Sequence, residues 1–351
     1  MKDIIVKPNI TILQAMKALD KTAEKCLLVV NENKKLLGTL TDGDLRRSIL
    51  AGIKFSEDIS NCFNINPTTF SLNEYSAENG KKLLRDLKLD LIPIIDDDNL
   101  IVDYVTWSTL GDDSQQKKKF LPLDIPIVIM AGGKGTRMEP FTSILPKPLV
   151  PVRDKPIIEH IIERFTSLSC NDFYLTVNYK SRILKAYFEE LKPDYNVNFI
   201  EEKDPLGTAG SLRYLKDKFV QPFFVTNCDI IIKAEYCSVY EFHQKGGYDI
   251  TLVASAKEHV IPYGTCEVNS NGHLSHIEEK PKYDFLINTG LYVINPDMLN
   301  LIPKNKFYHI THLIEDAKNQ GKKVGVFPID DDAWVDVGEW KEYKKTLEQF
   351  E

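Results

Sequence analysis

Residues 127–152 read IVIMAGGKGTRMEPFTSILPKPLVPV, an apolar run followed by glycines and then by two cations, Arg137 and Lys147. An apolar run of this kind is typical of an interior strand, and the glycines after it let the backbone approach a ligand closely. Successive backbone N–H groups in such a loop can point at one anion, commonly a phosphate. The spacing fits neither a P-loop nor the dinucleotide fingerprint, because Gly135 replaces the Ser or Thr and Met138 replaces the third glycine. The loop therefore predicts a phosphate site of another kind.

Two acidic residues from distant segments could serve the same site. Asp229 follows the apolar stretch PFFVTNC, and Asp336 lies in WVDVGEW. Magnesium prefers one or two protein carboxylates together with phosphate oxygens of a substrate. Two acids and two cations around a glycine loop would therefore suit a reaction between phosphate-bearing substrates.

The elements that must position these residues fall into two halves. The composition changes at residues 111–124, GDDSQQKKKFLPLD, which are polar and charged and then contain a proline, as linkers do. A chain of 351 residues is long enough for two domains. We therefore predict a domain at 1–112, a linker at 113–124 and a second domain at 125–351.

The second half alternates strands with helices. The expected strands are IPIVIM, DFYLTVN, NVNFIEE and PFFVTNCD, and the expected helices lie at 157–169, at 181–191 and from Ala209 onward. This alternation is typical of an α/β fold with a doubly wound, mostly parallel, Rossmann-like sheet. Ligands of such sheets bind at the carboxyl ends of the strands, where the glycine loop and Asp229 are expected.

The first half contains an internal repeat. The stretch LLVVNENKKLLGTLT (27–41) aligns with IPIIDDDNLIVDYVT (92–106) at an offset of 65 residues. Each copy reads as a hairpin, and each follows a helical stretch, at 12–25 and at 76–88. A repeated unit of this size must bury its apolar face against its twin.

Bulk composition excludes several classes of protein. The formal charge of −7 argues against general nucleic-acid binding. No window is apolar enough to span a bilayer, and the first residues do not resemble a signal peptide. Six scattered cysteines without a C-x-x-C pair read as reduced thiols. We therefore expect a cytoplasmic protein that binds neither nucleic acid nor membrane.

Six sequence blocks in the second half resemble the signature of sugar nucleotidyltransferases. In order they are AGGKGTRMEP with LPKP, DPLGTAGSL, NCD, EEKP, NTGLYVI and WVDVGEW, within residues 125–340. Such enzymes join a sugar 1-phosphate to a nucleoside triphosphate. The resemblance implies that a sugar phosphate oxygen attacks the α-phosphorus, with release of pyrophosphate and with Mg2+ as cofactor.

The resemblance also implies roles for particular residues. Arg137 would bind phosphate oxygens through bidentate hydrogen bonds of its guanidinium group, and Lys147 would add a positive charge near the α-phosphoryl group. Asp229 and Asp336 would hold the metal. The implied nucleotide-binding residues are Ala131, Gly132, Gly133, Gly135, Thr136, Glu202, Leu206, Gly207 and Thr208. The implied sugar-phosphate-binding residues are Gly264, Glu279, Lys280, Asn288, Thr289 and Gly290.

The identity of the base depends on Glu202, which resembles the residue that reads the base edge in this superfamily. Guanine presents two adjacent donors, and one carboxylate can accept from both. Uracil and thymine present one donor, which a glutamate could also accept. GTP is therefore favoured, and UTP and TTP stay open.

The first half resembles a pair of CBS modules, which often bind adenine nucleotides as a regulatory domain. The feature that carries the resemblance is GTLTDGDLRR (38–47), in which Thr41 and Asp44 would hold the ribose and phosphate. The second copy has Asp103 in place of the glycine and Thr109 in place of the acid, so at most one complete site is expected. The alternative is a dimerisation module without a ligand, and paired CBS modules commonly make homo-oligomers.

A CBS pair ahead of a short transferase domain is similar to the bacterial glucosamine-1-phosphate guanylyltransferases of the legionaminic acid pathway, which feeds flagellin or surface glycosylation. This similarity implies GTP and a hexose 1-phosphate, glucosamine 1-phosphate, as substrates and GDP-glucosamine as product. Two alternatives remain at this point. One is the same chemistry on mannose 1-phosphate with GTP, or on glucose 1-phosphate with UTP or TTP. The other is a nucleotide-sensing protein without catalysis.

Overall fold

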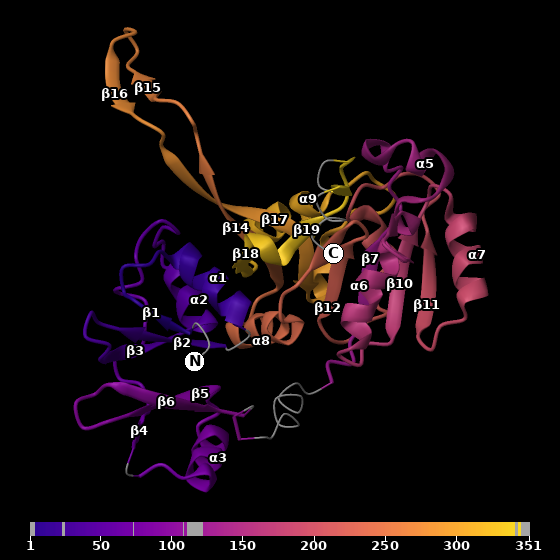
Figure 1. Cartoon of the computed structure of the whole chain (residues 1–351). Coiled ribbons are helices and arrows are strands. Elements are labelled where there is room, and N and C mark those ends of the chain that lie inside the picture. Colours follow the sequence, from indigo (N-terminus) through magenta and orange to yellow (C-terminus); the bar gives the residue numbers. More distant parts are fainter. Residues whose placement is uncertain are drawn as a thin grey trace. The chain divides into compact units, whose positions relative to one another are not determined.

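The chain divides into two compact units in a computed structural model (Figure 1). Residues 1–119 and 256–287 form the first unit, and residues 120–255 and 288–351 form the second. The structure describes residues 4–22, 25–72, 74–107, 109–110, 122–340 and 343–344. Most of the linker predicted at 113–124 lies outside the described residues, so the three domain boundaries stay predictions. Among the described helices none is both long and apolar enough to cross a membrane.

The first unit contains two small sheets that repeat one another. Its helices are α1 (Ile12–Thr22), α2 (Asp42–Leu50) and α3 (Ala77–Asp86), and its N-terminal strands are β1 (Ile5–Val6), β2 (Cys26–Val30), β3 (Leu36–Thr41), β4 (Phe70–Ser71), β5 (Leu91–Ile95) and β6 (Ile101–Thr106). The sheet orders are β1-β2-β3 and β4-β5-β6, and in each the first two strands are parallel and the last two antiparallel. Cys26 pairs with Thr41 and Leu91 pairs with Thr106. The register shift falls at the same place in both copies, so the repeat with its offset of 65 residues is confirmed.

The two copies pack against each other through their hairpin turns. Leu36 N donates to Asn99 O at 2.9 Å, and Asn99 Nδ2 donates to Leu36 O at 2.9 Å. Leu91 and Tyr104 of the second copy join the apolar core of the first. The prediction that each copy of the repeat buries its apolar face against the other copy is therefore confirmed.

Gly38 is where the two copies differ for a steric reason. A Cβ on Gly38 would lie 2.2 Å from Asn64 O and 2.6 Å from Phe63 Cδ2. The equivalent position holds Asp103, which is exposed. We expect Gly38→Ala to lower the free energy of unfolding by about 2 kcal/mol or more, because the crossing backbone must shift. Asp103→Ala is the matched control and should change it by less than about 0.5 kcal/mol in denaturant titrations. Equal effects of the two substitutions would contradict this interpretation.

A long β arm returns to the first unit from the central sheet. The arm is made of the outer parts of β14 (Ile250–Val260) and β17 (Lys282–Ile294) and the hairpin of β15 (Thr265–Val268) and β16 (Leu274–Glu278). Ala256 lies in the core of the first unit, and Phe55 N donates to Asp284 Oδ2 at 2.8 Å. These contacts assign residues 256–287 to the unit formed by the N-terminal residues.

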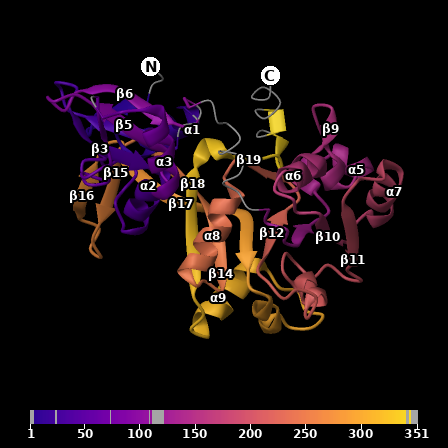
Figure 2. The same ribbon diagram turned by 90° about the horizontal axis from the view of Figure 1, so that it is seen from below.

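The second unit is built on a seven-stranded sheet of order β11-β10-β7-β12-β17-β14-β18. Its other main elements are β7 (Ile127–Met130), α6 (Ile157–Thr166), β10 (Asp172–Val177), α7 (Ser181–Leu191), β11 (Asn196–Glu201), β12 (Phe223–Asn227), α8 (Tyr236–Gly246), α9 (Ile310–Asn319) and β18 (Val324–Asp330). Short elements connect them: η1 (Thr136–Met138), α5 (Phe141–Ile144), η2 (Lys147–Leu149), β8 (Pro151–Val152), β9 (Lys155–Pro156), η3 (Gly210–Leu215), β13 (Ile230–Ile232), η4 (Pro296–Leu301), η5 (Asp331–Ala333) and β19 (Trp334–Asp336). Strands β11, β10, β7 and β12 are parallel, and β17 runs antiparallel to β12. Figures 1 and 2 show β10 beside β11 from two directions. The predicted α/β fold with a mostly parallel sheet is confirmed.

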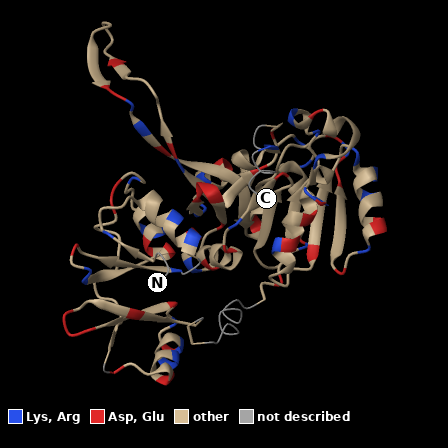
Figure 3. Cartoon of the chain, in the orientation of Figure 1, with Lys and Arg blue, Asp and Glu red and all other residues tan. Residues whose placement is uncertain are grey.

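Strand β7 is uninterruptedly apolar because both of its faces are covered. Ile127 and Ile129 enter the core that contains α6, α7 and α8. Val128 and Met130 enter the core that contains η3, η4 and α9. Neither β7 nor its neighbour β12 carries a charged residue (Figure 3). The strand exit is thereby held between two packed layers.

Two sequence predictions for the second unit are wrong in detail. The helix expected from Ala209 is instead the short 3-10 segment η3, and the N–H groups at its start, those of Ala209 and Gly210, donate to Tyr308 O at 2.9 and 3.1 Å. The NTG stretch (288–290) reads as a turn because of its Asn and Gly, but it lies inside β17. Gly290 there has φ 89°, and a Cβ on it would lie 2.4 Å from Asn227 Nδ2.

Candidate active site

A cavity of about 360 Å³ opens at the carboxyl ends of the parallel strands. The chain runs from β7 outward to β10 and β11 and then returns to β12 on the other side, so the cavity lies where the strand order reverses. Its lining residues all belong to the second unit: Met130, Gly132, Gly133, Gly135, Arg137, Lys147, Thr176, Glu202, Pro205, Gly207, Thr208, Asn227, Cys228, Asp229 and Phe307. Most of the predicted catalytic and nucleotide-binding residues are among them. Ala131 and Leu206 are instead buried beside it, and Thr136 is exposed.

The glycine loop is shaped by a close approach at Gly135. Gly135 has φ 70°, and a Cβ on it would lie 2.9 Å from Thr142 Cγ2 and 3.1 Å from Lys147 Cβ. Thr142 Oγ1 donates to Gly135 O at 2.8 Å and fixes the turn. Glycine is therefore required here both for the backbone conformation and for the space that Lys147 occupies.

Lys147, Asp229 and Asp336 converge on one point beside Gly338. A Cβ on Gly338 would lie 2.4 Å from Asp229 Oδ2, 2.9 Å from Asp336 Oδ1 and 3.0 Å from Lys147 Nζ. Lys147 forms an ion pair with Asp229, and their side chains are only 13% and 11% exposed. The two acids, predicted from distant segments, are thus brought together with a cation.

Strand pairing explains why these acids meet. Ile230 of β13 pairs with Asp336 of β19, and Val337 N donates to Asp229 O at 2.9 Å. Gly338 N donates to Asp336 Oδ1 at 2.7 Å and orients that carboxylate. Burial raises the pKa of Asp336 above its ordinary value, and the negative charge of Asp229 adds to the rise. A divalent cation would offset both effects.

This donor set fits a hard cation that takes few protein ligands. Two carboxylate oxygens face a common point, and among the described residues no group of three or more His, Cys, Asp or Glu side chains is arranged to hold a metal. Magnesium commonly binds to one or two carboxylates and takes its other ligands from water and substrate phosphates. Asp229 and Asp336 therefore suit Mg2+ better than zinc, which prefers four protein ligands in a closed site.

Arg137 lies at the cavity with a loosely held partner. Its Nη1 donates to Glu339 Oε1 at 2.6 Å, and the two side chains are 59% and 52% exposed. Exposed ion pairs of this kind contribute little stability. Arg137 can therefore exchange Glu339 for a phosphate oxygen at small cost.

Glu202 lies beneath the glycine loop and is 8% exposed. Its Oε1 would lie 3.0 Å from a Cβ on Gly132, and its Oε2 accepts from Leu206 N at 3.2 Å. Burial raises the pKa of the Glu202 carboxyl, against the lowering effect of the hydrogen bond from Leu206 N. The folded protein therefore holds this proton more tightly than the unfolded chain does.

Glu202→Gln should raise thermal stability at neutral pH. Because the pKa of Glu202 is raised in the folded protein, its carboxyl contributes most to the free energy of unfolding below the ordinary pKa of 4.5. This contribution is lost as the pH rises through the pKa of the folded state. The gain in melting temperature should therefore disappear in melts below pH 4.5. Glu201→Gln is the matched control, because the ion pair with Lys185 lowers the pKa of Glu201. A gain from Glu201→Gln that equals the gain from Glu202→Gln would contradict the prediction.

The predicted sugar-phosphate residues belong to different units. Gly264, Glu279 and Lys280 lie on the exposed β arm of the first unit, where a Cβ on Gly264 would lie 2.9 Å from Glu279 Oε2. Asn288, Thr289 and Gly290 belong to the second unit. The Thr289 hydroxyl donates to Val253 O at 2.8 Å, and the Asn288 carboxamide contacts Tyr292 Oη at 2.8 Å. The structure thus brings Gly264 and Glu279 together, and it gives Thr289 a buried structural contact.

Sequence reasoning gave no role to several residues of the site, and three of them matter for its geometry. Gly338 was visible inside WVDVGEW, two positions after Asp336, but only the pairing of β13 with β19 reveals its neighbours. Asn227 precedes Cys228 and Asp229 at the end of β12 and lines the cavity. Phe307 also lines it, and no local pattern around this residue signals a role.

Comparison with known proteins agrees with this architecture. Residues 127–351 match the family described as Nucleotidyl transferase, and residues 1–51 match the CBS domain family. The mannose-1-phosphate guanyltransferase of Schizosaccharomyces pombe is 35% identical over 226 residues, which are 62% of this chain and 61% of that protein. The enzyme of the same name from Saccharomyces cerevisiae is 33% identical over 226 residues, 62% of each chain. The chain thus spans about three fifths of the length of these curated relatives.

Solved structures are similar in fold. HddC from Yersinia pseudotuberculosis aligns with a TM-score of 0.52 and 24% identity, over 65% of this chain and 100% of that one. The inositol-1-phosphate CTP transferase of T. maritima aligns with a TM-score of 0.50 and 18% identity, over 65% and 97% of the two chains. Such low identities support the fold alone. The family match covers well over half of the sequence, and the chain belongs to the nucleotidyl transferase family.

Proposed function

We propose that this protein transfers a nucleoside monophosphate from a nucleoside triphosphate to a sugar 1-phosphate, giving a nucleoside diphosphate sugar and pyrophosphate. The observation that carries the proposal is the convergence of Lys147, Asp229 and Asp336 beside Gly338, at the edge of a cavity lined by Lys147, Asp229 and the glycine loop. A phosphate oxygen of the sugar substrate would attack the α-phosphorus, and the bond to the pyrophosphate leaving group would break. Two polyanions must meet for this reaction, so fixed positive charge and aligned geometry are its main requirements.

The residues of the cavity divide this work between them. Backbone N–H groups of Gly132, Gly133 and Gly135 would bind the triphosphate, and Arg137 would leave Glu339 to grip its outer oxygens. Lys147 would exchange Asp229 for the α-phosphoryl group, where negative charge grows during transfer. Asp229 and Asp336 would hold Mg2+, which when bound supplies positive charge next to the reacting phosphates and helps to align them.

We further propose GTP as the nucleotide. The buried Glu202 lies beside Gly132 and Leu206, where its carboxylate could accept from the two adjacent donors of guanine. The names of the yeast relatives, mannose-1-phosphate guanyltransferases, support the same base. UTP and TTP remain the alternatives, because a single imide N–H could also be accepted.

The sugar is proposed at two levels. A hexose 1-phosphate follows from the family, and mannose 1-phosphate is favoured by the names of the curated relatives. Glucosamine 1-phosphate is the other candidate, and its product would be GDP-glucosamine for legionaminic acid synthesis. This candidate rests on the order of the domains, with a CBS pair ahead of the transferase domain. Glu279 and Lys280 of the β arm are the proposed contacts for the sugar hydroxyls and its phosphate.

One assay tests these proposals together. The full chain is mixed with Mg2+, each of GTP, UTP, TTP, CTP and ATP, and each of mannose, glucosamine and glucose 1-phosphates, and pyrophosphate is measured. Release with GTP and one hexose 1-phosphate is the expected result. No release with any pair would overturn the activity and favour the alternative of a nucleotide-sensing protein.

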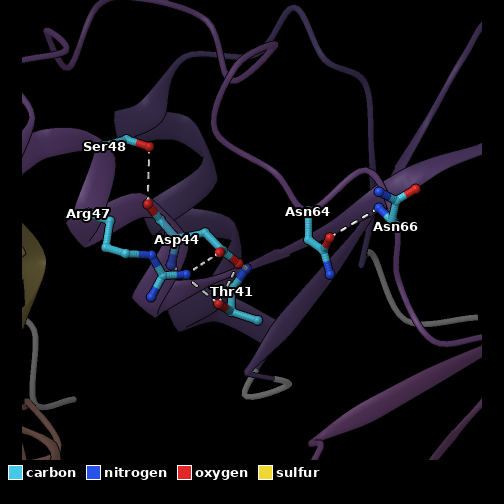
Figure 4. Close-up of polar contacts among 6 residues, drawn as sticks. All are labelled: Thr41, Asp44, Arg47, Ser48, Asn64 and Asn66. Atoms are coloured by element: carbon cyan, nitrogen blue, oxygen red, sulfur yellow. Dashed lines mark hydrogen bonds and ion pairs between the residues drawn. The ribbon is translucent and has the colours of Figure 1, made fainter.

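We also propose that the first unit binds an adenine nucleotide beside Thr41 and Asp44. Figure 4 shows the two side chains together, with Thr41 Oγ1 donating to Asp44 Oδ2 at 2.6 Å and Arg47 paired with Asp44. The same two residues form a capping box at the start of α2, in which Thr41 N donates to Asp44 Oδ2 at 2.8 Å and Asp44 N donates to Thr41 Oγ1 at 3.3 Å. This is a sufficient structural role without a ligand. Addition of AMP, ADP or ATP to the assay distinguishes the two roles, since only a regulatory nucleotide site predicts altered turnover.

A further inference from the structure

We infer that Phe307 is the stacking surface for the nucleobase, a role that rests on the proposed function and that no motif assigns. Phe307 is the one aromatic residue among those lining the cavity in the described part of the chain. It shares that lining with Glu202 and with Pro205, Gly207 and Thr208 of the DPLGTAGSL block. A flat purine needs an apolar face to lie on, and an aromatic ring supplies one to any base.

A rigid backbone attachment holds Phe307 at this wall. Tyr308 N donates to Leu206 O at 2.8 Å, and Tyr308 O accepts from Ala209 N at 2.9 Å and from Gly210 N at 3.1 Å. The attachment is so close that a Cβ on Gly207 would lie 2.8 Å from Tyr308 O. The segment that carries Phe307 is therefore fixed to the DPLGTAGSL block, which the sequence assigns to the nucleotide.

The next link extends this attachment into helix α9. Ile310 N, in the first turn of α9, donates to Thr208 Oγ1 at 2.9 Å. Thr208 also contacts His309 Nδ1 at 3.5 Å. These hydrogen bonds join the loop to the segment before α9, and they fix the backbone on either side of Phe307 relative to the loop.

Neighbouring side chains explain why this ring faces the cavity. Tyr308 is 8% exposed and joins the apolar core with its hydroxyl bonded to Asp316, so its ring occupies the inner side of the segment. Phe307 is 62% exposed, more than any other described phenylalanine. The centroids of the Phe307 and His309 rings are 4.7 Å apart with an interplanar angle of 81°, an edge-to-face contact that leaves ring surface open.

The expected effect concerns base binding and not phosphate binding. The full chain with Mg2+ is titrated calorimetrically with GTP and, separately, with inorganic tripolyphosphate, which has the three linked phosphates of the nucleotide but no ribose or base. Phe307→Ala should weaken GTP binding about 10- to 100-fold, the usual effect of removing a stacking ring. Tripolyphosphate should bind the variant as it binds the wild type, which also shows that the variant is folded.

Two further substitutions separate stacking from bulk. Phe307→Leu keeps an apolar side chain without a ring and should still lose most of the GTP affinity, whereas Phe307→Trp should retain it. Tyr214→Ala is the matched control, since Tyr214 is an exposed aromatic of the same unit that does not line the cavity. This control should bind both ligands normally.

The outcomes are distinct. Unchanged GTP binding by Phe307→Ala, equal losses for GTP and tripolyphosphate, or normal binding by Phe307→Leu would each overturn the stacking role and leave the proposed function intact. The proposed function, and the stacking role with it, would be overturned if the wild-type protein bound none of GTP, UTP, TTP, CTP and ATP more tightly than it binds tripolyphosphate.

Discussion

Asp229→Asn is expected to lower kcat/KM for pyrophosphate release by roughly 100- to 1,000-fold, the usual cost of removing one strong electrostatic contact from a transition state. The substitution keeps the size of the side chain and removes the charge that pairs with Lys147 and faces Asp336. With one carboxylate left, the Mg2+ concentration needed for half-maximal rate should also rise. Initial rates measured across a Mg2+ series give both quantities.

A matched substitution separates this effect from a general loss of charge. Asp297→Asn neutralises an exposed aspartate at the start of η4, outside the cavity. Its rates and Mg2+ dependence should equal those of the wild type. If Asp229→Asn kept the wild-type Mg2+ dependence with a normal rate, Asp229 would not be a metal ligand.

Gly338→Ala is expected to abolish divalent-cation binding without removing any charged group. The added methyl would lie 2.4 Å from Asp229 Oδ2 and 2.9 Å from Asp336 Oδ1, so the two oxygens would be forced apart. Activity should fall by roughly 10- to 100-fold, the usual cost of disturbing the groups that orient metal ligands. Paramagnetic resonance of Mn2+ as the probe ion measures the loss of binding directly, without reliance on turnover.

The control for this variant is a second glycine of the same cavity. A Cβ on Gly133 would meet nothing within 4 Å, so Gly133→Ala should bind Mn2+ normally whatever its effect on nucleotide. Normal Mn2+ binding by Gly338→Ala would show that the acids do not meet over an ion at this point.

The parts of the fold that local pattern could predict are those whose cause is local. An apolar run with two covered faces and a glycine exit predicts β7 and its loop. The matching stretches at 27–41 and 92–106 predict two hairpins in one register, and the structure reproduces that register including its irregularity. These strands and hairpins can be predicted because the pattern of apolar residues within a few positions is enough to indicate them.

The parts that could not be predicted depend on contacts between segments far apart in the chain. The Tyr308 carbonyl, about a hundred residues further along the chain, accepts from the N–H groups of Ala209 and Gly210 at the start of η3, and no local pattern indicates this contact. Phe307 reaches the cavity only because of the same contact. Gly338 is a plain glycine in sequence, and its importance follows from three side chains that other segments supply.

The route of the chain through Ala256 and Asp284 has a consequence for biosynthesis and for dissection of the molecule. The N-terminal unit is incomplete until residues 256–287 have left the ribosome, because Ala256 fills its core and the Asp284 carboxylate accepts from Phe55 N. A fragment cut at the linker would expose that core position and leave an amide without its acceptor. The first unit therefore becomes complete late in translation, after most of the seven-stranded sheet has been made.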